Sequence, residues 1–521
     1  MRLVAVWLAA CSLTAQAAPA LVYCADAEPD GFDSARSDLA ATHRAAALPL
    51  YDRLFDLDAQ GRPIAGLASA WTVSTDGRRY LLTLRRGVKF HRTAWFAPSR
   101  DFNADDVVWS LNRQLDPAHP GAKVAPAGFP GAISGAWTQL IRKVEKVADD
   151  RVSIELHRPY APLPVLLASW QTSIVSAEYG ARLAAAGRDA ELAQWPVGTG
   201  PYQLERYERG ATIRYRAHPD YFKGRAAIER LLFAIVPDPA VRVQKLRRGE
   251  CQLVDGLKPL DQAAIKTDAR LRLLSYRPQI TSFLAFNTTR KPFEDARVRR
   301  ALSIVIDRRA LIAAVFEGAA DSGLGPYSGK TLWGAGTSAA PAADLATARK
   351  LLAEAGFQDG FATAIWVRQG GGTSNLNPKL SAESIQADWA RLGIRTEVVV
   401  MDGAELSRRT RQGEHAVVIS GWMNSLDPDE LYANLLSCEA ARSSATRWCD
   451  PAFDKLLDQA RADSDPARRE QRYREAETRF IAESPWATLA YPYAVLAHRV
   501  ELSGVTPSPA APFRFERLRW K

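Results

Sequence analysis

The sequence has few of the residues that metal and redox chemistry require. Its 521 residues include 5 cysteines, 7 histidines and 3 methionines, and the cysteines form no Cys-x-x-Cys pair. The histidines are scattered, so no set of ligands with metal-binding spacing is present. We therefore expect no metal site and no cofactor, and a zinc site built from the cysteines is the weaker alternative to disulfide bonds.

Motifs of covalent catalysis are also missing. No Gly-x-Ser-x-Gly element is present, and Gly198-Thr199-Gly200 is not followed by the Gly-Lys-Ser/Thr of a phosphate-binding loop. An exported peptide hydrolase would need a nucleophile and a base in one cleft. A binding protein is the better interpretation, and we expect the protein not to be an enzyme.

No hydrophobic run after the N-terminus is long enough to span a bilayer. Arg2 precedes the apolar stretch Leu3–Ala15, and Ala15-Gln16-Ala17 has the form of a cleavage site. We interpret residues 1–20 as a signal peptide for export. Leu8–Cys11 resembles a lipobox, so a lipid anchor at Cys11 is the alternative to a soluble product.

Export leaves an even number of cysteines in an oxidising compartment. The four that remain allow three pairings. Cys438 and Cys449 flank the polar loop EAARSSATRW and could close it locally, which would leave Cys24 to pair with Cys251.

The charge pattern does not single out nucleic acid as a partner. The formal net charge is +10, but charged residues make up 24% of the chain, both signs are interspersed, and no long Lys/Arg block occurs. Hydrophobic residues make up 47% of the chain, a globular value. At this length we expect two or three domains.

A dense basic run follows a predicted hairpin within Leu67–His91. The strands alternate on either side of an Asp76-Gly77 turn, and the run Arg85–His91 comes next. The run is either a site or a solvated face of a scaffold, and exposed charge on a strand favours the scaffold. Gly87 is predicted to adopt a backbone shape that a larger residue would strain.

Strands and helices alternate through most of the chain. A helix from Pro239 to Gly249 between two strands predicts a β-α-β unit, and Asp295–Gly318 has the spacing of one helix. Asp344 is a plausible N-cap for the helix that follows it. These features predict two α/β lobes with mostly parallel sheets, the first carrying a β-rich insertion.

Several motifs occur together and in order: FNADDVVWSLNRQLDP, PVGTGPYQLERY, FLAFNTTRKPFEDARVRRALSIVIDR, GWMNSLDPDELY and WCDPAFDKLL. In this combination the chain resembles the solute-binding proteins of bacterial peptide ABC importers (solute-binding protein family 5). Within that family it looks most like the dipeptide-binding and Sap-type (antimicrobial-peptide-sensitivity) proteins.

The resemblance implies an α/β fold of the two-lobed, hinged periplasmic binding protein (class II, cluster C type). Lobe one would comprise residues 21–283 and 491–521, with an additional β-rich subdomain at roughly 55–190. Lobe two would comprise residues 284–490. The chain would cross between lobes near Phe283–Asn287 and Leu489–Tyr493.

The resemblance also implies a function. The protein would capture peptides in the periplasm by lobe closure and deliver them to an inner-membrane ABC permease, acting as a monomer. The Sap-type likeness would add a role in antimicrobial peptide resistance. The alternative is a non-peptide solute such as haem on the same fold.

Two terminal anchors are expected, because buried charges need partners. In the dipeptide-binding relatives an Asp after a Gly-Trp pair holds the peptide amine; here Trp422, Met423 and Asn424 are followed by Ser425 at that position. Asp427 is the nearest acid, and it either replaces the anchor or caps the next helix together with Asp429. Trp422 either stacks on the ligand or belongs to the core.

The carboxylate-binding Arg of those relatives falls at Gly372 in this chain. Arg368 lies close by in the sequence and either substitutes for it or is an exposed Arg at a strand end. Gly198, Thr199 and Gly200 resemble a loop beside the cleft. With both anchors missing or moved, a longer peptide or a non-peptide ligand becomes easier to accommodate.

Overall fold

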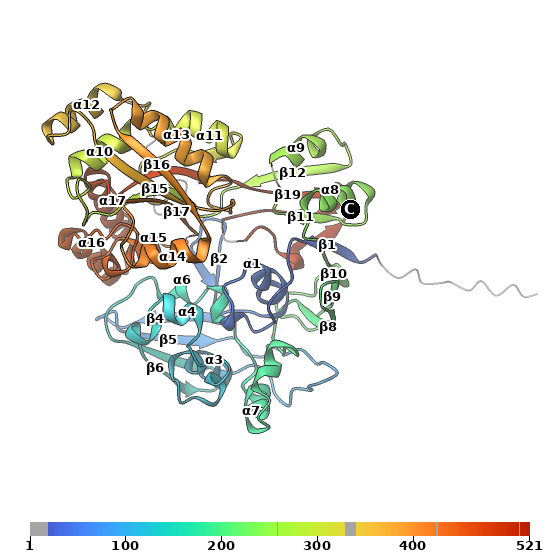
Figure 1. Ribbon diagram of the computed structural model, residues 1–521. Helices are drawn as coiled ribbons and strands as arrows, with labels where there is room; N and C mark the ends of the chain where they lie inside the picture. The colour runs from blue at the N-terminus through green and yellow to red at the C-terminus, as the bar shows by residue number, and fades with distance from the viewer. Residues whose placement is uncertain (1–18, 258, 329–339, 424–425, 510) are drawn as a thin grey trace, which may run out of the picture.

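The computed structural model describes residues 19–257, 259–328, 340–423, 426–509 and 511–521. The predicted signal peptide therefore lies almost wholly outside the described residues, as does Cys11. Two large mixed β-sheets with their own helices form two lobes, and a smaller sheet extends the first (Figure 1). Among the described residues, no helix is both long and apolar enough to cross a membrane.

Lobe one is built on a seven-stranded sheet in which only the central strands are parallel. Its order is β12 (Leu271–Tyr276), β19 (Ala494–Arg499), β11 (Leu253–Asp255), β1 (Leu21–Ala25), β10 (Arg230–Ile235), β9 (Thr212–Ala217) and β8 (Tyr202–Glu208). The predicted helix is α8 (Pro239–Arg248), and Gly249 ends it in the left-handed region. It links β10 to β11, which run parallel, as expected, but with β1 between them.

Lobe two is built on a six-stranded sheet. Its order is β14 (Ala320–Asp321), β18 (Trp486–Pro492), β13 (Ile280–Phe286), β17 (Val417–Met423), β15 (Ala362–Arg368) and β16 (Arg395–Met401). Only the pairs β17–β15 and β15–β16 are parallel. The prediction of mostly parallel sheets is wrong here because the chain enters through β13 and leaves through β18, and these central strands pair antiparallel.

Helices cover both faces of the lobe-two sheet. One face carries α10 (Ala296–Ile304), α11 (Arg308–Phe316), α12 (Leu345–Glu354) and α13 (Pro378–Ala390). The other carries α14 (Gly403–Arg411), α15 (Pro428–Leu435), α16 (Pro451–Ala462) and α17 (Pro466–Glu483). The single helix predicted over Asp295–Gly318 is two helices, because Asp307 caps a new one by accepting from the Ala310 N–H.

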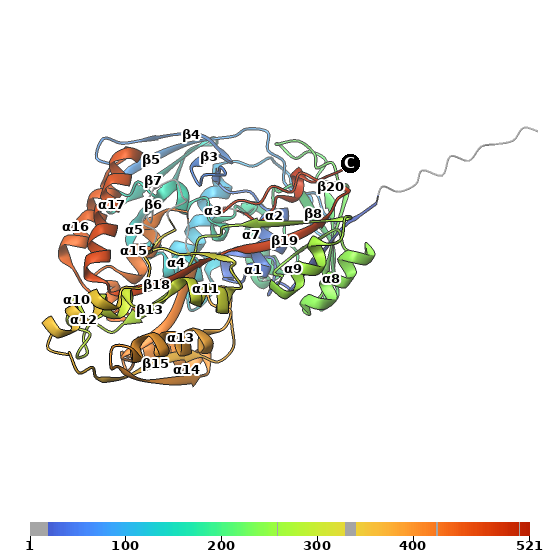
Figure 2. The same ribbon diagram turned by 90° about the horizontal axis from the view of Figure 1, so that it is seen from above.

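A four-stranded antiparallel sheet forms the subdomain of lobe one. Its order is β4 (Ala68–Val73), β5 (Arg79–Leu84), β7 (Arg151–Leu156) and β6 (Ile141–Ala148) (Figure 2). Helix α3 (Ala104–Leu115) packs against β6 and β7, and α7 (Ala177–Ala185) packs against α3. The basic run after β5 is scaffold: Arg86 pairs with Asp150 and Lys89 with Asp101, both in solvent. Gly87 has a φ of 74°, as predicted.

Shorter elements complete the chain. They are α1 (Ala40–Thr42), α2 (Leu48–Leu50), β2 (Phe55–Leu57), β3 (Pro63–Ala65), α4 (Pro130–Ser134), α5 (Trp137–Leu140), α6 (Leu163–Leu166), α9 (Pro259–Lys266), β20 (Leu502–Ser503) and β21 (Arg519–Trp520).

The chain passes between the two sheets twice. The first passage is residues 277–279, between β12 and β13, and the second is Tyr493, between β18 and β19. Tyr493 falls at the end of the expected crossing Leu489–Tyr493, whereas residues 277–279 precede the expected crossing Phe283–Asn287, and Phe283 packs in the lobe-two core. The assignment of residues 21–283 and 491–521 to lobe one and of residues 284–490 to lobe two stays a prediction.

The two predicted disulfide pairings are confirmed. Cys24 in β1 is bonded to Cys251, which directly precedes β11, and Cys438 is bonded to Cys449. The first ties the start of the described chain into the central strands of lobe one. The second closes a loop of lobe two.

Candidate ligand-binding site

The carboxyl ends of the parallel strands in lobe two face lobe one. Ile280, the first residue of β13 after the passage, lies opposite Met423, the last residue of β17. Because β15 and β16 run parallel to β17, their last residues, Arg368 and Met401, lie at the same edge. In α/β folds, ligands bind at such carboxyl edges.

Two of the predicted site residues share one face of this edge. Trp366 and Val418 belong to the core beneath α15, α16 and α17, and Trp422 packs against that core. Arg368 follows Trp366 by two residues in β15, so its side chain points to the same face. The sheet therefore presents an aromatic ring and a guanidinium toward lobe one from neighbouring strands.

Arg368 lies against Gly372, the position at which the family pattern expects an Arg. A Cβ built on Gly372 would lie 3.1 Å from Nη1 of Arg368. Arg368 is exposed, and within the described part of the chain it makes no hydrogen bond or ion pair. The guanidinium thus occupies the space in front of Gly372 without a hydrogen bond of its own. Its charge adds to the backbone hydrogen bonds from Ala404 and Glu405 that lower the pKa of Asp402.

The loop after Arg368 is fastened to the strands that carry Trp422 and Thr281. Ser374 fits so closely over Gly421 that a Cβ at Gly421 would overlap its side chain. The Asn375 side-chain amide donates to the Ser282 hydroxyl at 3.3 Å. These contacts bring the two predicted anchor segments together.

Asp427 is a helix cap whose carboxylate is fully engaged. Its Oδ1 accepts from the Asp429 N–H at 3.1 Å and from the Tyr473 hydroxyl at 3.1 Å, and its Oδ2 accepts from Nη2 of Arg469 at 2.7 Å. The residue is 2% exposed. Burial disfavours the charge on Arg469, but Asp427 overcomes this and raises the Arg469 pKa. The structure realises the capping alternative, so Asp427 is part of the scaffold in this conformation.

Asp429 joins the two lobes directly. Its Oδ2 accepts from the Tyr160 hydroxyl at 2.8 Å, and its Oδ1 accepts from Nε of Arg461 at 2.7 Å. The neighbouring Ala161 N–H donates to the Arg461 carbonyl at 2.7 Å. Tyr160 and Ala161 follow β7 of the subdomain, so these bonds hold it against α15 and α16.

The Gly198–Gly200 loop is buried in lobe one. The Thr199 hydroxyl donates to Asp52 at 2.9 Å, and a Cβ on Gly198 would overlap the Leu50 carbonyl. The His91 ring accepts from the Gly198 N–H at 3.3 Å and bonds the Gly200 carbonyl at 2.9 Å. Glycine is needed here because backbone packs on backbone, and the expectation that this loop lies beside the cleft stays a prediction.

Asn424 and Ser425, also predicted in the site, lie outside the described residues. Trp422 is half-buried and its indole nitrogen is buried. Two residues absent from the prediction lie at the same boundary, Tyr160 and Gln279 of the first passage. No local pattern marks either; only the position of Gln279 directly before an apolar strand could have drawn attention to it.

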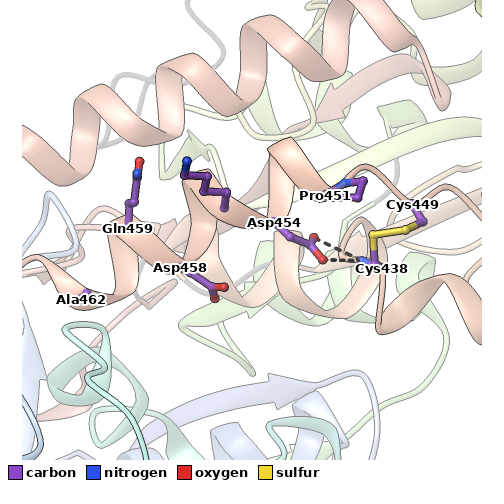
Figure 3. Close-up of a pocket in the computed structure, with 8 residues that line it drawn as sticks. Cys438, Cys449, Pro451, Asp454, Asp458, Gln459 and Ala462 are labelled. Atoms are coloured by element: carbon purple, nitrogen blue, oxygen red, sulfur yellow. Dashed lines mark hydrogen bonds between the residues drawn. A yellow bond between two sulfur atoms is a disulfide. The ribbon is translucent and has the colours of Figure 1, made fainter.

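A surface hollow elsewhere in lobe two contains none of the predicted ligand residues. It measures about 690 Å³ and runs along α16 beside the Cys438–Cys449 disulfide (Figure 3). Asp454 on its wall accepts from the Cys438 N–H at 3.1 Å. Among the described residues, no group of three or more His, Cys, Asp or Glu side chains could hold a metal ion.

Comparison with known proteins finds relatives that cover nearly the whole chain. The chain is 40% identical over 509 residues to a probable di/tripeptide-binding protein 5 of Pseudomonas aeruginosa, covering 97% of this chain and 96% of that protein. It is 37% identical over 494 residues to the heme-binding protein A of Haemophilus influenzae, covering 94% and 90%. A crystal structure of a dipeptide-binding protein from Pseudoalteromonas in complex with Met-Leu has a TM-score of 0.81 and 31% identity, covering 96% of this chain and all of that one.

A protein-family model also matches most of the sequence. Residues 62–443 match the model described as bacterial extracellular solute-binding proteins, family 5 middle. The members of this family are binding proteins. The chain belongs to the family 5 bacterial extracellular solute-binding proteins.

Proposed function

We propose that this protein binds short peptides between its lobes and delivers them to an ABC permease of the inner membrane. The observation that carries the proposal is the exposed Arg368 guanidinium, which lies on the same sheet face as Trp422 at the carboxyl edge of lobe two. A guanidinium suits a carboxylate, and an indole suits apolar atoms. A peptide carboxyl end offers both within a few ångströms.

Closure of the lobes would enclose the peptide. The two passages, at 277–279 and Tyr493, are short enough to act as a hinge, and the Tyr160–Asp429 bond already joins the lobes. A ligand that contacts both lobes favours the closed form by its differential affinity. We propose that the protein works in this way as a periplasmic monomer after removal of residues 1–20, without chemical change to the peptide.

A Sap-type role in antimicrobial peptide resistance would require acidic groups facing a cationic ligand. Asp427 and Asp429 are both engaged by arginines, so neither supports that specificity. We propose small peptides as the ligand ahead of cationic antimicrobial ones. Haem is the second candidate, because one relative of similar identity carries that name.

Titration calorimetry distinguishes these ligands. Met-Leu, Met-Leu amide, a cationic amphipathic peptide and haemin are titrated into the purified mature protein. We expect Met-Leu to bind and its amide, which lacks the carboxylate, to bind at least tenfold more weakly. Tight binding of haemin with a shifted absorbance band, and no heat from any peptide, would overturn the proposal.

A further inference from the structure

The two disulfides of this protein differ in their access to solvent. Cys449 is exposed and Cys438 is half-buried, whereas Cys24 and Cys251 are both 0% exposed. A thiolate opens a disulfide by attacking one of its sulfur atoms, so access to a sulfur decides which bond reacts. In the folded protein a dissolved thiol can therefore reach the Cys438–Cys449 bond but not the Cys24–Cys251 bond.

The accessible disulfide lies on the wall of the surface hollow along α16. The hollow measures about 690 Å³, and ligand pockets in proteins measure about 300–1,000 Å³, so a small organic thiol fits inside. Both cysteines line it, together with Pro451, Asp454, Lys455, Asp458, Gln459 and Ala462 (Figure 3).

The loop that the disulfide closes is also held by contacts of its own. The Thr446 carbonyl accepts from the Thr288 N–H at 2.9 Å, and the Ala445 carbonyl bonds the His415 ring at 2.7 Å. Trp448 in the same loop is 5% exposed and belongs to the core of lobe two. Opening of the disulfide should therefore leave the loop in place and lobe two folded.

We propose that the Cys438–Cys449 disulfide is an exchange site for low-molecular-weight thiols. The thiolate of the small molecule attacks Sγ of the exposed Cys449 and forms a new S–S bond with it. The bond to Cys438 breaks, its electron pair stays on Sγ of Cys438, and that sulfur takes up a proton from water. The reverse attack by the Cys438 thiolate expels the small thiol and restores the disulfide.

The charge beside the disulfide favours thiols that carry an amine. Asp454 points toward Cys438, accepts its N–H at 3.1 Å and makes no ion pair within the described part of the chain (Figure 3). Asp458 is already paired with Arg461 at 3.1 Å. Lys455 follows Asp454 on the helix and so points about 100° away from it. The carboxylate of Asp454 therefore attracts a cationic thiol to the bond.

The inference goes beyond the proposed function and does not depend on it. Peptide mass spectrometry with cysteamine, an amine-bearing thiol, locates the attacked sulfur. The purified mature protein is incubated with cysteamine in native buffer, quenched with acid and alkylated with N-ethylmaleimide. We expect the mixed disulfide on Cys449 and the alkylated thiol on Cys438, with Cys24 and Cys251 still joined. Tryptophan fluorescence should keep its native spectrum because Trp448 stays buried.

Two dithiols with the same carbon skeleton test the role of charge. Dithiothreitol is neutral, and 2-aminobutane-1,4-dithiol carries an ammonium group. The rate at which each opens the bond, divided by its thiolate fraction, gives a cation-to-neutral ratio. We expect this ratio to fall about threefold in Asp454→Asn, which keeps an acceptor for the Cys438 N–H but loses the charge. Asp458→Asn, on the same helix, is the matched control and should keep the wild-type ratio, because Arg461 already pairs with that carboxylate.

Salt supplies a measurement that needs no variant. In the wild-type protein the cation-to-neutral ratio should fall as the salt concentration rises, because salt screens the Asp454 charge. A ratio that changes neither with salt nor in Asp454→Asn would overturn the preference for amine-bearing thiols.

Three results would overturn the exchange site itself. The first is a Cys438–Cys449 bond that opens only in urea, or no faster than Cys24–Cys251 in the folded protein. The second is a mixed disulfide on Cys438 in place of Cys449. The third is loss of the native fluorescence spectrum on opening, which would make the bond a structural link.

Discussion

Asp427 and Arg368, the two charged candidates for holding the ends of a ligand, both belong to lobe two but differ in burial and in hydrogen-bond partners. Asp427 is 2% exposed and engaged by Arg469, Tyr473 and a backbone N–H. Arg368 is exposed and has no such partner in the described chain. The difference shows that charge and position in the sequence do not identify a ligand contact. A charged side chain that is already bonded to other residues of the protein is not available to a ligand.

The largest effect should come from breaking the Asp427 pair. Arg469→Met leaves a buried carboxylate without its cation, which typically costs about 3–5 kcal/mol of unfolding free energy. Urea unfolding followed by tryptophan fluorescence measures the loss. Affinity for Met-Leu, measured on the fraction that remains folded, should stay near the wild-type value because Asp427 does not hold the ligand.

Arg474→Met is the matched control on the same helix. Arg474 pairs with Glu470 on the surface, where such a pair contributes at most about 1 kcal/mol. A large loss of Met-Leu affinity in Arg469→Met, with stability unchanged, would reverse the roles assigned to the two charges.

Changing Arg368 should produce the opposite pattern. Arg368→Ala removes a charge-assisted bond to the ligand carboxylate, worth about 1.5–3 kcal/mol, so affinity should fall by about 10–100-fold. The urea midpoint should not change. Arg395→Ala, an exposed arginine at the opposite end of the neighbouring strand, is the control and should alter neither quantity. Equal affinities for Met-Leu in Arg368→Ala and wild type would show that Arg368 does not bind the ligand carboxylate.

Local chemistry made the helix ends predictable. Asp344 caps its helix by accepting from the Thr347 N–H, three residues away, and Gly249 ends α8, both as expected. The pairing of Cys438 with Cys449 was predictable for the same reason, since both partners lie close together in the sequence.

The commitment of Asp427 was not predictable, because its partner Arg469 lies 42 residues further on and meets it only through the packing of α15 against α17. The same holds for the Gly198–Gly200 loop, whose burial depends on Leu50 and Asp52. Strand pairing in lobe two depends on where β13 and β18 enter the sheet. The sequence therefore predicts local caps and turns better than contacts between residues that lie far apart in the chain.

Lowering the pH should destabilise the protein through His91, a second buried group that is already hydrogen-bonded. Burial, reinforced by His218, lowers the His91 pKa from 6.5 to about 3, although its bond to the Gly200 carbonyl opposes this. The folded state therefore keeps His91 neutral while the unfolded state binds a proton below pH 6.5. The free energy of unfolding is therefore unaffected by His91 above pH 6.5. It falls by about 1.4 kcal/mol for each pH unit as the pH decreases from 6.5 toward 3.

Urea unfolding between pH 7 and pH 4.5 measures this slope. In His91→Gln the slope should decrease by about 1.4 kcal/mol per pH unit relative to wild type. His157→Gln, which changes an exposed histidine, should keep the wild-type slope. An unchanged slope in His91→Gln would remove the evidence that the ring is committed to the Gly198–Gly200 loop.

The smallest effect concerns the bond that joins the lobes. Tyr160→Phe removes the donor to Asp429 and leaves Arg461 to hold that carboxylate, so the closed arrangement should lose about 1 kcal/mol. Because the ligand favours the closed form, the apparent affinity for Met-Leu should fall about fivefold, mainly through faster release. Tyr202→Phe removes a hydroxyl bond to the Ile228 carbonyl within lobe one, so it should lower the urea midpoint without changing release. Stopped-flow release rates distinguish the two, and equal release from Tyr160→Phe and wild type would mean that the Tyr160–Asp429 bond does not contribute to closure.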